Sequence, residues 1–168
     1  MSEQSIEIVE HDPRWKSMFE SEKKLLAKLI KPWLCGSIEH IGSTSVHGLA
    51  AKPVIDIMVG VHSLKASRNT IDILSKNGYC YYPYKAEIMH WFCKPTPEIR
   101  THHLHLVPFE SALWQERIKF RDCLRANAEL ANNYAKLKLT LAKEHKNDRD
   151  LYTMNKWSFI KSVIESID

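Results

Sequence analysis

The chain has 168 residues, 44% of them hydrophobic, which is enough for one sizeable core, and a single domain is predicted over residues 1–168. Charged residues make up 26% of the chain and aromatic residues 10%, a composition that excludes an intrinsically disordered protein. The formal net charge of +4 comes from Lys and Arg spread along the chain, so no nucleic-acid-binding surface is predicted from charge.

The first predicted elements are a short strand and an amphipathic helix. Residues 6–9 predict the strand. Asp12 then stands directly before Pro13, the usual order at a helix start. Apolar residues recur at helical spacing from Trp15 onward, so we expect a helix that ends near Pro32.

The middle of the chain is predicted to supply most of a sheet. Residues 37–43 predict a strand that runs into a tight turn at Gly42, and the β-branched run over 54–61 predicts a strand buried on both faces. A helix is expected over 64–76, because Asn77-Gly78 is a typical terminator. Further strands are expected over residues 79–82, 89–93 and 102–107.

Beyond Pro108 the hydrophobic pattern becomes helical. Helices are expected over about 111–125, 128–145 and 150–167. Strands first and helices last indicate an α+β fold, with the helices covering one face or one side of the sheet.

Cysteine usage and the N-terminus both indicate a soluble, cytoplasmic protein. The cysteines have neither the spacing of a redox pair nor that of a zinc site, so buried free thiols are predicted at Cys35, Cys80, Cys93 and Cys123. Residues 1–5 lack the start of a secretory signal, and no stretch approaches the ~20 apolar residues of a membrane span. We therefore expect no membrane partner, and the sequence predicts no oligomeric state.

A polar turn is the first candidate for chemistry. Gly42, Ser43 and Thr44 follow a predicted strand, and a Gly-Ser turn lets backbone N–H groups and small hydroxyls approach an anion closely. Phosphate is the ligand that such a turn favours. Lys52, a little further along, is a candidate countercharge, although most lysines are simply solvated.

Polar residues on two apolar strands are the second candidate. Asp56 lies within the hydrophobic run, where a carboxylate needs a metal, a hydrogen-bond partner or a countercharge. His103 and His105 alternate with leucines, which places both imidazoles on one face of their strand. A structural hydrogen bond is about as good an explanation of each of these residues as a functional role. We predict that the Gly42-Ser43 turn, Asp56 and His105 converge on one pocket.

Several segments together resemble the GrpB family, a branch of the nucleotidyltransferase superfold. They are Asp12-Pro13-x-Trp15, residues 40–46 continuing into 48–56, and Thr101-His102-His103-Leu104-His105-Leu106-Val107, with further matches in the C-terminal helices. The resemblance covers nearly the whole chain. It implies a nucleotidyltransferase-like mixed β-sheet flanked by helices, in which the Gly42-Ser43 turn holds the phosphates of a nucleoside triphosphate.

The resemblance also assigns roles to the site residues. Asp56 would match the first metal-binding aspartate, and active members of the superfold carry a second acid two residues later, where this chain has Met58. A thioether does not bind a hard cation, so the two-metal arrangement is not expected here. Asp56, His103 and His105 would instead favour manganese or another transition metal over magnesium, or an imidazole would act as general base without a metal.

The C-terminal helices match the family at basic positions that would bind the triphosphate. These are Arg121, Lys138 and Lys156, each of which is as readily explained by a surface salt bridge. His47 replaces the proline that is usual in the family.

The expected function is binding of a nucleoside triphosphate or a related phosphorylated small molecule. Transfer of a nucleotidyl group to an unknown acceptor, with Asp56 and His105 as catalytic residues, is the enzymatic version of that expectation. One alternative is a noncatalytic nucleotide-binding or coenzyme A-related module, since the family also occurs fused to dephospho-coenzyme A kinase. The other is a metal-dependent hydrolase.

Overall fold

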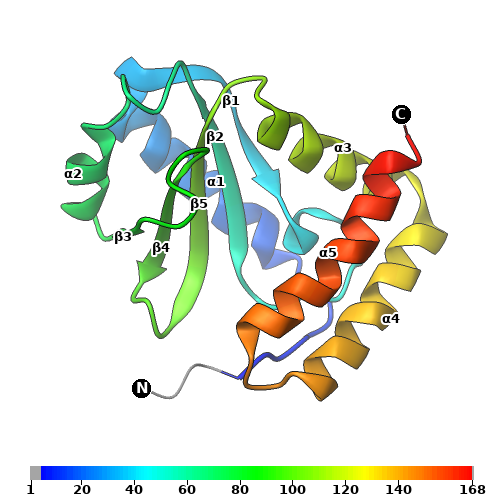
Figure 1. Ribbon diagram of the computed structural model, residues 1–168. Helices are drawn as coiled ribbons and strands as arrows, with labels where there is room; N and C mark the ends of the chain where they lie inside the picture. The colour runs from blue at the N-terminus through cyan, green and yellow to red at the C-terminus, as the bar shows by residue number, and fades with distance from the viewer. Residues whose placement is uncertain (1–4, 168) are drawn as a thin grey trace.

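A computed structural model describes residues 5–167, which form a five-stranded mixed sheet flanked by helices (Figure 1). The strands are β1 (Leu34–Ile41), β2 (Ile55–Val61), β3 (Cys80–Tyr82), β4 (His90–Pro95) and β5 (Arg100–Pro108). The helices are α1 (Arg14–Leu29), α2 (Thr70–Ser75), α3 (Ala112–Ala126), α4 (Ala128–Glu144) and α5 (Arg149–Glu165), with short 3-10 segments η1 (Lys31–Trp33) and η2 (Ser43–Ser45). The predicted α+β class is therefore confirmed.

The order of the strands across the sheet is β1-β2-β5-β4-β3. Only the β2–β5 pair is parallel, and the β1–β2, β4–β5 and β3–β4 pairs are antiparallel. In the parallel pair Asp56 stands opposite His103 and Met58 opposite His105. Directly paired residues point to the same face of a sheet, so these side chains share one face, while Ile55 and its alternate neighbours occupy the other.

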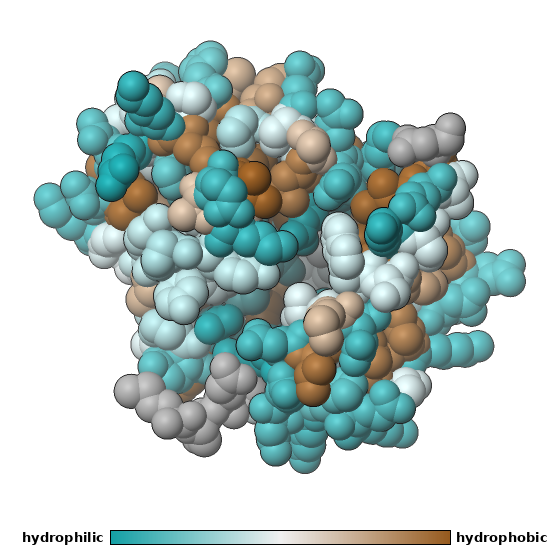
Figure 2. Space-filling view, in the orientation of Figure 1, coloured by the Kyte–Doolittle hydropathy of each residue, from teal (hydrophilic) through white to brown (hydrophobic). Residues whose placement is uncertain are grey.

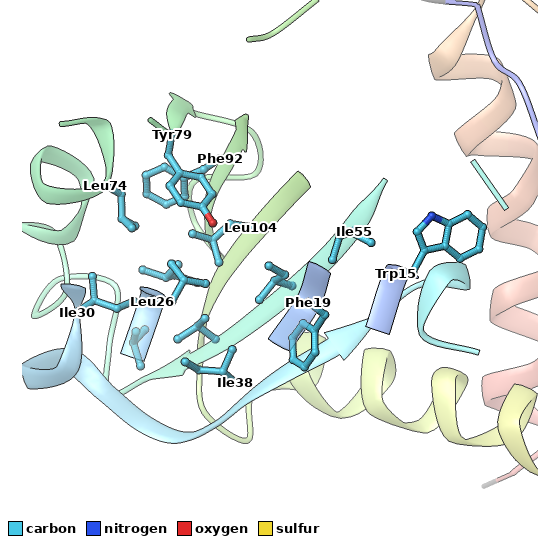
Figure 3. Packing of buried hydrophobic residues seen from close by; sticks show 14 of the residues in the cluster. Trp15, Phe19, Leu26, Ile30, Ile38, Ile55, Leu74, Tyr79, Phe92 and Leu104 are labelled. Atoms are coloured by element: carbon cyan, nitrogen blue, oxygen red, sulfur yellow. The ribbon is translucent and has the colours of Figure 1, made fainter. Parts of the chain in front are cut away.

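The second face packs against α1 and α2. Trp15, Phe19 and Leu26 of α1 contact buried strand residues such as Ile55 and Leu104 in the largest apolar cluster. Figure 3 shows these side chains gathered between the helix and the strands. Asp12 holds the start of α1, because its Oδ1 accepts a hydrogen bond from the backbone N–H of Arg14 at 2.9 Å.

The face that carries Asp56 is covered in part by α3. Trp114 of α3 packs with Met58, Trp91 and Val107 of the strands. The helices α4 and α5 run side by side on the right in Figure 1 and pack against α3, with Phe120, Tyr134 and other residues forming a separate apolar cluster. None of the helices within residues 5–167 is long and apolar enough to cross a membrane.

Two predicted elements are wrong in extent. Residues 6–9 form no strand, and Val9 alone makes an isolated antiparallel bridge with Ala51. The helix expected over 64–76 is reduced to α2. Ahead of α2 the chain forms turns, in which Ser67 donates both its backbone N–H, at 3.1 Å, and its hydroxyl, at 2.7 Å, to Ser63 O.

The cysteines are free thiols, as predicted, but their burial differs from the prediction. Cys93 is buried, whereas Cys35, Cys80 and Cys123 are partly exposed. Residues 1–4, where the absence of a secretory signal is predicted, lie outside the part of the chain that the structure describes.

Candidate functional site

The Gly42 turn lies directly against Asp56. Gly42 has φ 71° and ψ −176°, and a Cβ built on it would lie 2.6 Å from Asp56 Oδ2. This backbone conformation is almost confined to glycine, and the approach leaves no room for a side chain. Ser45 closes the turn by donating its backbone N–H to Gly42 O at 3.2 Å. Glycine is therefore the one residue type that fits where the backbone at position 42 passes the Asp56 carboxylate.

Asp56 is held by the imidazoles of β5. His103 Nδ1 donates to Asp56 Oδ1 at 3.1 Å, and His105 Nε2 lies 3.5 Å from the same oxygen. Burial alone would raise the pKa of the Asp56 carboxyl, but the hydrogen bonds and charges of both histidines lower that pKa well below its ordinary value. Asp56 is therefore an ionised carboxylate at neutral pH. The Gly42 turn, Asp56 and His105 thus lie together, with His103 beside them, and their convergence on one pocket stays a prediction.

The two histidines differ in how far their side chains are exposed to solvent. The side chain of His105 is 9% exposed and that of His103 is 18% exposed. Burial is the largest cause that lowers the pKa of His105, so its imidazole is neutral at pH 7. His103 Nε2 and His105 Nε2 are both buried without a hydrogen-bond partner among the described residues, and His105 Nε2 lies 3.5 Å from Asp56 Oδ1. An imidazole that donates from Nδ1, as His103 does to Asp56, has its acceptor nitrogen at Nε2.

Met58 is fully buried in the apolar cluster beneath α3. The position that would carry a second carboxylate is therefore part of the core. Within residues 5–167 no group of three or more His, Cys, Asp and Glu side chains is arranged to hold a metal ion. The histidines instead contact Asp56 directly, and the metal role of Asp56, His103 and His105 stays a prediction.

Cationic side chains gather beside Asp56. Burial lowers the pKa of Lys52 to about 8, and the nearby charges of Arg149, Lys156 and Arg100 act in the same direction, while Asp56 opposes them. These groups come from the segment before β2, from α5 and from the start of β5. Figure 2 shows the surface hollowed between the strands and α5, where these elements face one another.

Lys138 extends this group into the interior. Its side chain is 2% exposed and its Nζ donates to Ala50 O. Burial, followed by the charge of Lys156, lowers the pKa of Lys138 to about 7. The ammonium lies over the Tyr134 ring, 4.8 Å from its centroid, which compensates part of the lost hydration.

Two predicted site residues have structural partners instead. Arg121 Nη1 contacts Glu39 Oε2 at 2.5 Å and its Nε contacts Asp122 Oδ1 at 2.9 Å, so two carboxylates neutralise it. The Thr44 hydroxyl donates to Val54 O at 3.2 Å and lies 2.9 Å from His40 Nε2. Thr44 also lines a separate pocket of about 1070 Å³ between α1, the 43–50 loop and α4. Neither residue is placed to bind a ligand beside Asp56.

The family is decided by comparison with known proteins. The family model described as GrpB protein matches residues 5–166. The chain belongs to the GrpB family. This GrpB-family chain is 36% identical over 166 residues to the glutamate-rich protein GrpB of Alkalihalophilus pseudofirmus, with 95% of this chain and 94% of that protein covered. It is 32% identical to UPF0157 protein YqkA of Bacillus subtilis, but spans only 47% of that longer relative.

Solved structures extend the comparison from sequence to fold. The crystal structure of conserved protein GrpB from Enterococcus faecalis matches with a TM-score of 0.84 at 32% identity, covering 96% of this chain and 99% of that chain. The structure of the GLD-2/RNP-8 complex matches with a TM-score of 0.60 at 11% identity, covering 95% and 61%. The second likeness concerns the fold alone, which is nucleotidyltransferase-like, as predicted.

Three residues of the candidate site could not be predicted from the sequence. Arg149 and Arg100 act on Lys52 from the starts of α5 and β5, and the Trp91 ring lies 5.1 Å from the His103 ring. Arginines at element ends resemble ordinary surface residues, so no local pattern marks them. Trp91 stands opposite His105 in the β4–β5 register, and only that pairing places it in the site.

Proposed function

We propose that this GrpB-family protein binds a nucleoside triphosphate or a related phosphorylated small molecule in the hollow between the sheet and α5. The observation that carries the proposal is the group of cations around Lys52, whose pKa is lowered first by burial and then by the charges of Arg149 and Lys156. Like charges in a partly buried space repel one another, and an anionic ligand would remove that repulsion. Phosphate groups supply the required charge and several acceptor oxygens.

The Gly42 turn supports the same ligand. Its backbone passes Asp56 without a side chain, and Ser43 follows at the start of η2. Backbone N–H groups of such turns bind phosphate oxygens when they converge on them. The proposed phosphate site therefore has the turn on one side and Lys52 and Lys156 on the other.

Nucleotidyl transfer is the finer proposal for the same site. The oxygen of an acceptor hydroxyl would attack the α-phosphorus, the bond from that phosphorus to the pyrophosphate oxygen would break, and pyrophosphate would leave. The hydroxyl proton would pass to an imidazole, because the low pKa of Asp56 makes its carboxylate a weak base. His103 is the acceptor in this proposal, because its side chain is the more exposed of the two and its Nδ1 donates to Asp56, which leaves Nε2 as the accepting nitrogen. His105 would keep Asp56 oriented beneath it.

A noncatalytic binding module is the second candidate. Met58 favours it, because a buried thioether in an apolar cluster replaces the second metal-binding acid. Nucleotidyl transfer and noncatalytic binding predict the same ligand, but only nucleotidyl transfer releases pyrophosphate from it. Mixing the protein with each nucleoside triphosphate and following pyrophosphate release with magnesium, manganese, zinc or no metal distinguishes them.

Replacing a lysine of the proposed phosphate site should weaken binding. Lys52→Gln and Lys156→Gln each remove one charge, and we expect about tenfold weaker binding of tripolyphosphate for each, as for loss of a charge-assisted hydrogen bond. Lys161→Gln is the matched control on the same helix as Lys156, since Lys161 is exposed and pairs with Glu165. Isothermal titration calorimetry measures all of these affinities. Equal affinities in the Lys52 and Lys161 variants would contradict the proposed site.

Asp56→Asn tests whether the carboxylate binds a metal or only orients the histidines. The amide keeps an oxygen acceptor for His103, so we expect little loss of fold stability. In the presence of manganese, binding of a nucleoside triphosphate should weaken at least several-fold if Asp56 is a ligand. With EDTA, removal of the negative charge should leave tripolyphosphate binding unchanged or stronger. A large loss of stability with unchanged binding in manganese would retire the metal-ligand role.

A further inference from the structure

An aromatic shelf lies on the same sheet face as Asp56. It consists of Tyr82, Tyr84 and Trp91, which come from β3, from the β3–β4 connection and from β4. The Tyr82 and Tyr84 rings each lie 6.4 Å from the Trp91 ring, at steep interplanar angles. Tyr82 stands opposite Trp91 in the antiparallel register, so both side chains point to one face.

The shelf offers ring surface to solvent. Tyr82 is 61% exposed and Tyr84 is 45% exposed, whereas Trp91 beneath them is 8% exposed. Exposed aromatic side chains gathered in one place are uncommon on a protein surface and mark binding sites. Each tyrosine ring meets the buried Trp91 ring in an edge contact, and the rest of its surface is exposed to solvent.

Basic side chains accompany the rings. The Arg100 guanidinium lies 5.3 Å from the centre of the Trp91 ring, and Lys85 Nζ lies 5.5 Å from the centre of the Tyr84 ring. Arg100 also acts electrostatically on Lys52. It therefore lies between the shelf and the cationic group of the proposed phosphate site.

Contacts connect the shelf to Asp56. The Trp91 ring lies 5.1 Å from the His103 ring, and His103 Nδ1 lies 3.1 Å from Asp56 Oδ1. In the strand order, β5 separates β2 from β4, so the shelf begins about 10 Å across the sheet from Asp56. In Figure 1, β3 and β4 lie on the opposite side of β2 from α5, which carries Lys156. One ligand of nucleotide size spans this distance, with its anionic end toward α5 and its other end at the shelf.

We infer that the shelf binds the heteroaromatic base of the ligand whose phosphates occupy the cationic hollow. This inference rests on the proposed function and names the chemical class of the ligand: a nucleotide, not a simple polyphosphate or sugar phosphate. The base stacks on Tyr82 or Tyr84, with Arg100 at its edge. Every nucleobase has a face that can stack on an aromatic ring. Nucleoside triphosphates whose bases stack with similar strength should therefore bind with similar affinity, whether the base is a purine or a pyrimidine.

The test compares two probes, a nucleoside triphosphate and inorganic tripolyphosphate, on the full chain by calorimetry. The wild-type protein is expected to bind the nucleotide at least about tenfold more tightly than tripolyphosphate, the increment typical of one stacked base. Tyr82→Ala/Tyr84→Ala should abolish this preference and leave tripolyphosphate affinity unchanged. Tyr82→Phe/Tyr84→Phe, which keeps both rings, should retain it. Should the double alanine variant fail to fold, each single alanine variant must lose part of the preference.

The outcomes separate this inference from the proposed function. Equal wild-type affinity for both probes, or an undiminished preference in the alanine variants, overturns the base site and leaves the phosphate site standing. Failure of the wild-type protein to bind either probe overturns both. Much tighter binding of a single-stranded oligonucleotide than of the mononucleotide overturns the inference in favour of a nucleic-acid ligand.

Discussion

Lys138→Met is expected to make the ligand-free protein more stable at pH 7. Lys138 is buried with its pKa lowered from 10.5 to about 7, so keeping it in the folded state costs roughly 4 kcal/mol at pH 7 relative to the unfolded chain. Methionine has a similar length and no charge to desolvate. Loss of the hydrogen bond to Ala50 O cancels about 1 kcal/mol of this gain, so the net gain in unfolding free energy is about 3 kcal/mol. Urea unfolding of both proteins measures the difference.

The pH dependence identifies the cause of that gain. Because folding lowers the pKa of Lys138 from 10.5 to about 7, the unfolded chain binds the proton more strongly across that interval. The destabilisation that Lys138 causes therefore decreases as the pH rises above 7. The gain in unfolding free energy from Lys138→Met should accordingly shrink by pH 10. A variant less stable than wild type at pH 7 would show that the contact with Ala50 outweighs the buried charge.

The same variant should lose ligand-induced stabilisation. A bound phosphate favours the protonated forms of Lys138 and Lys52, whose pKa values are lowered to about 7 and about 8, so nucleotide binding at pH 7.5 should be accompanied by proton uptake, which Lys138→Met reduces to the share of Lys52. Calorimetry in buffers of different ionisation enthalpy measures that proton directly. A buried lysine that lowers the stability of the ligand-free fold is the pattern expected of a ligand site.

Gly42→Ala is expected to destabilise the fold and disrupt the site together. The added Cβ would lie 2.6 Å from Asp56 Oδ2, and the backbone has φ 71° with extended ψ. Such a conformation costs a non-glycine residue about 1–3 kcal/mol, and relief of the clash must move either the turn or the carboxylate. We expect a loss of about 3 kcal/mol in unfolding free energy and at least tenfold weaker tripolyphosphate binding.

Gly48→Ala is the matched control for this experiment. Gly48 also has a positive φ of 76°, but a Cβ there meets nothing within 4 Å. Gly48→Ala therefore reports the backbone strain alone, and the difference between the variants reports the contact with Asp56. Equal effects of both substitutions on binding would mean that the approach of Gly42 to Asp56 has no role in the site.

The sequence by itself determined the elements with strong periodicity. The β-branched run became β2, the alternation of histidine and leucine became β5, and the helical pattern beyond Pro108 became α3, α4 and α5. These segments are long and their apolar spacing admits one kind of structure. Weak signals failed: residues 6–9 formed only the isolated bridge of Val9 with Ala51, and residues 64–69 formed turns, in which Ser67 and Thr70 bond to backbone carbonyls through both N–H and hydroxyl.

The tertiary structure decided which predicted site residues meet. Alternation placed His103 and His105 on one face, but only the parallel β2–β5 register set that face toward Asp56. Arg121 looked equivalent to Lys138 in sequence, yet packing gave Arg121 two carboxylates, whereas Lys138 is buried with no carboxylate partner within residues 5–167. The aromatic shelf depends on the pairing of β3 with β4. Local pattern fixes the direction of a side chain on its own element, whereas its partners depend on contacts between distant segments, which no local pattern encodes.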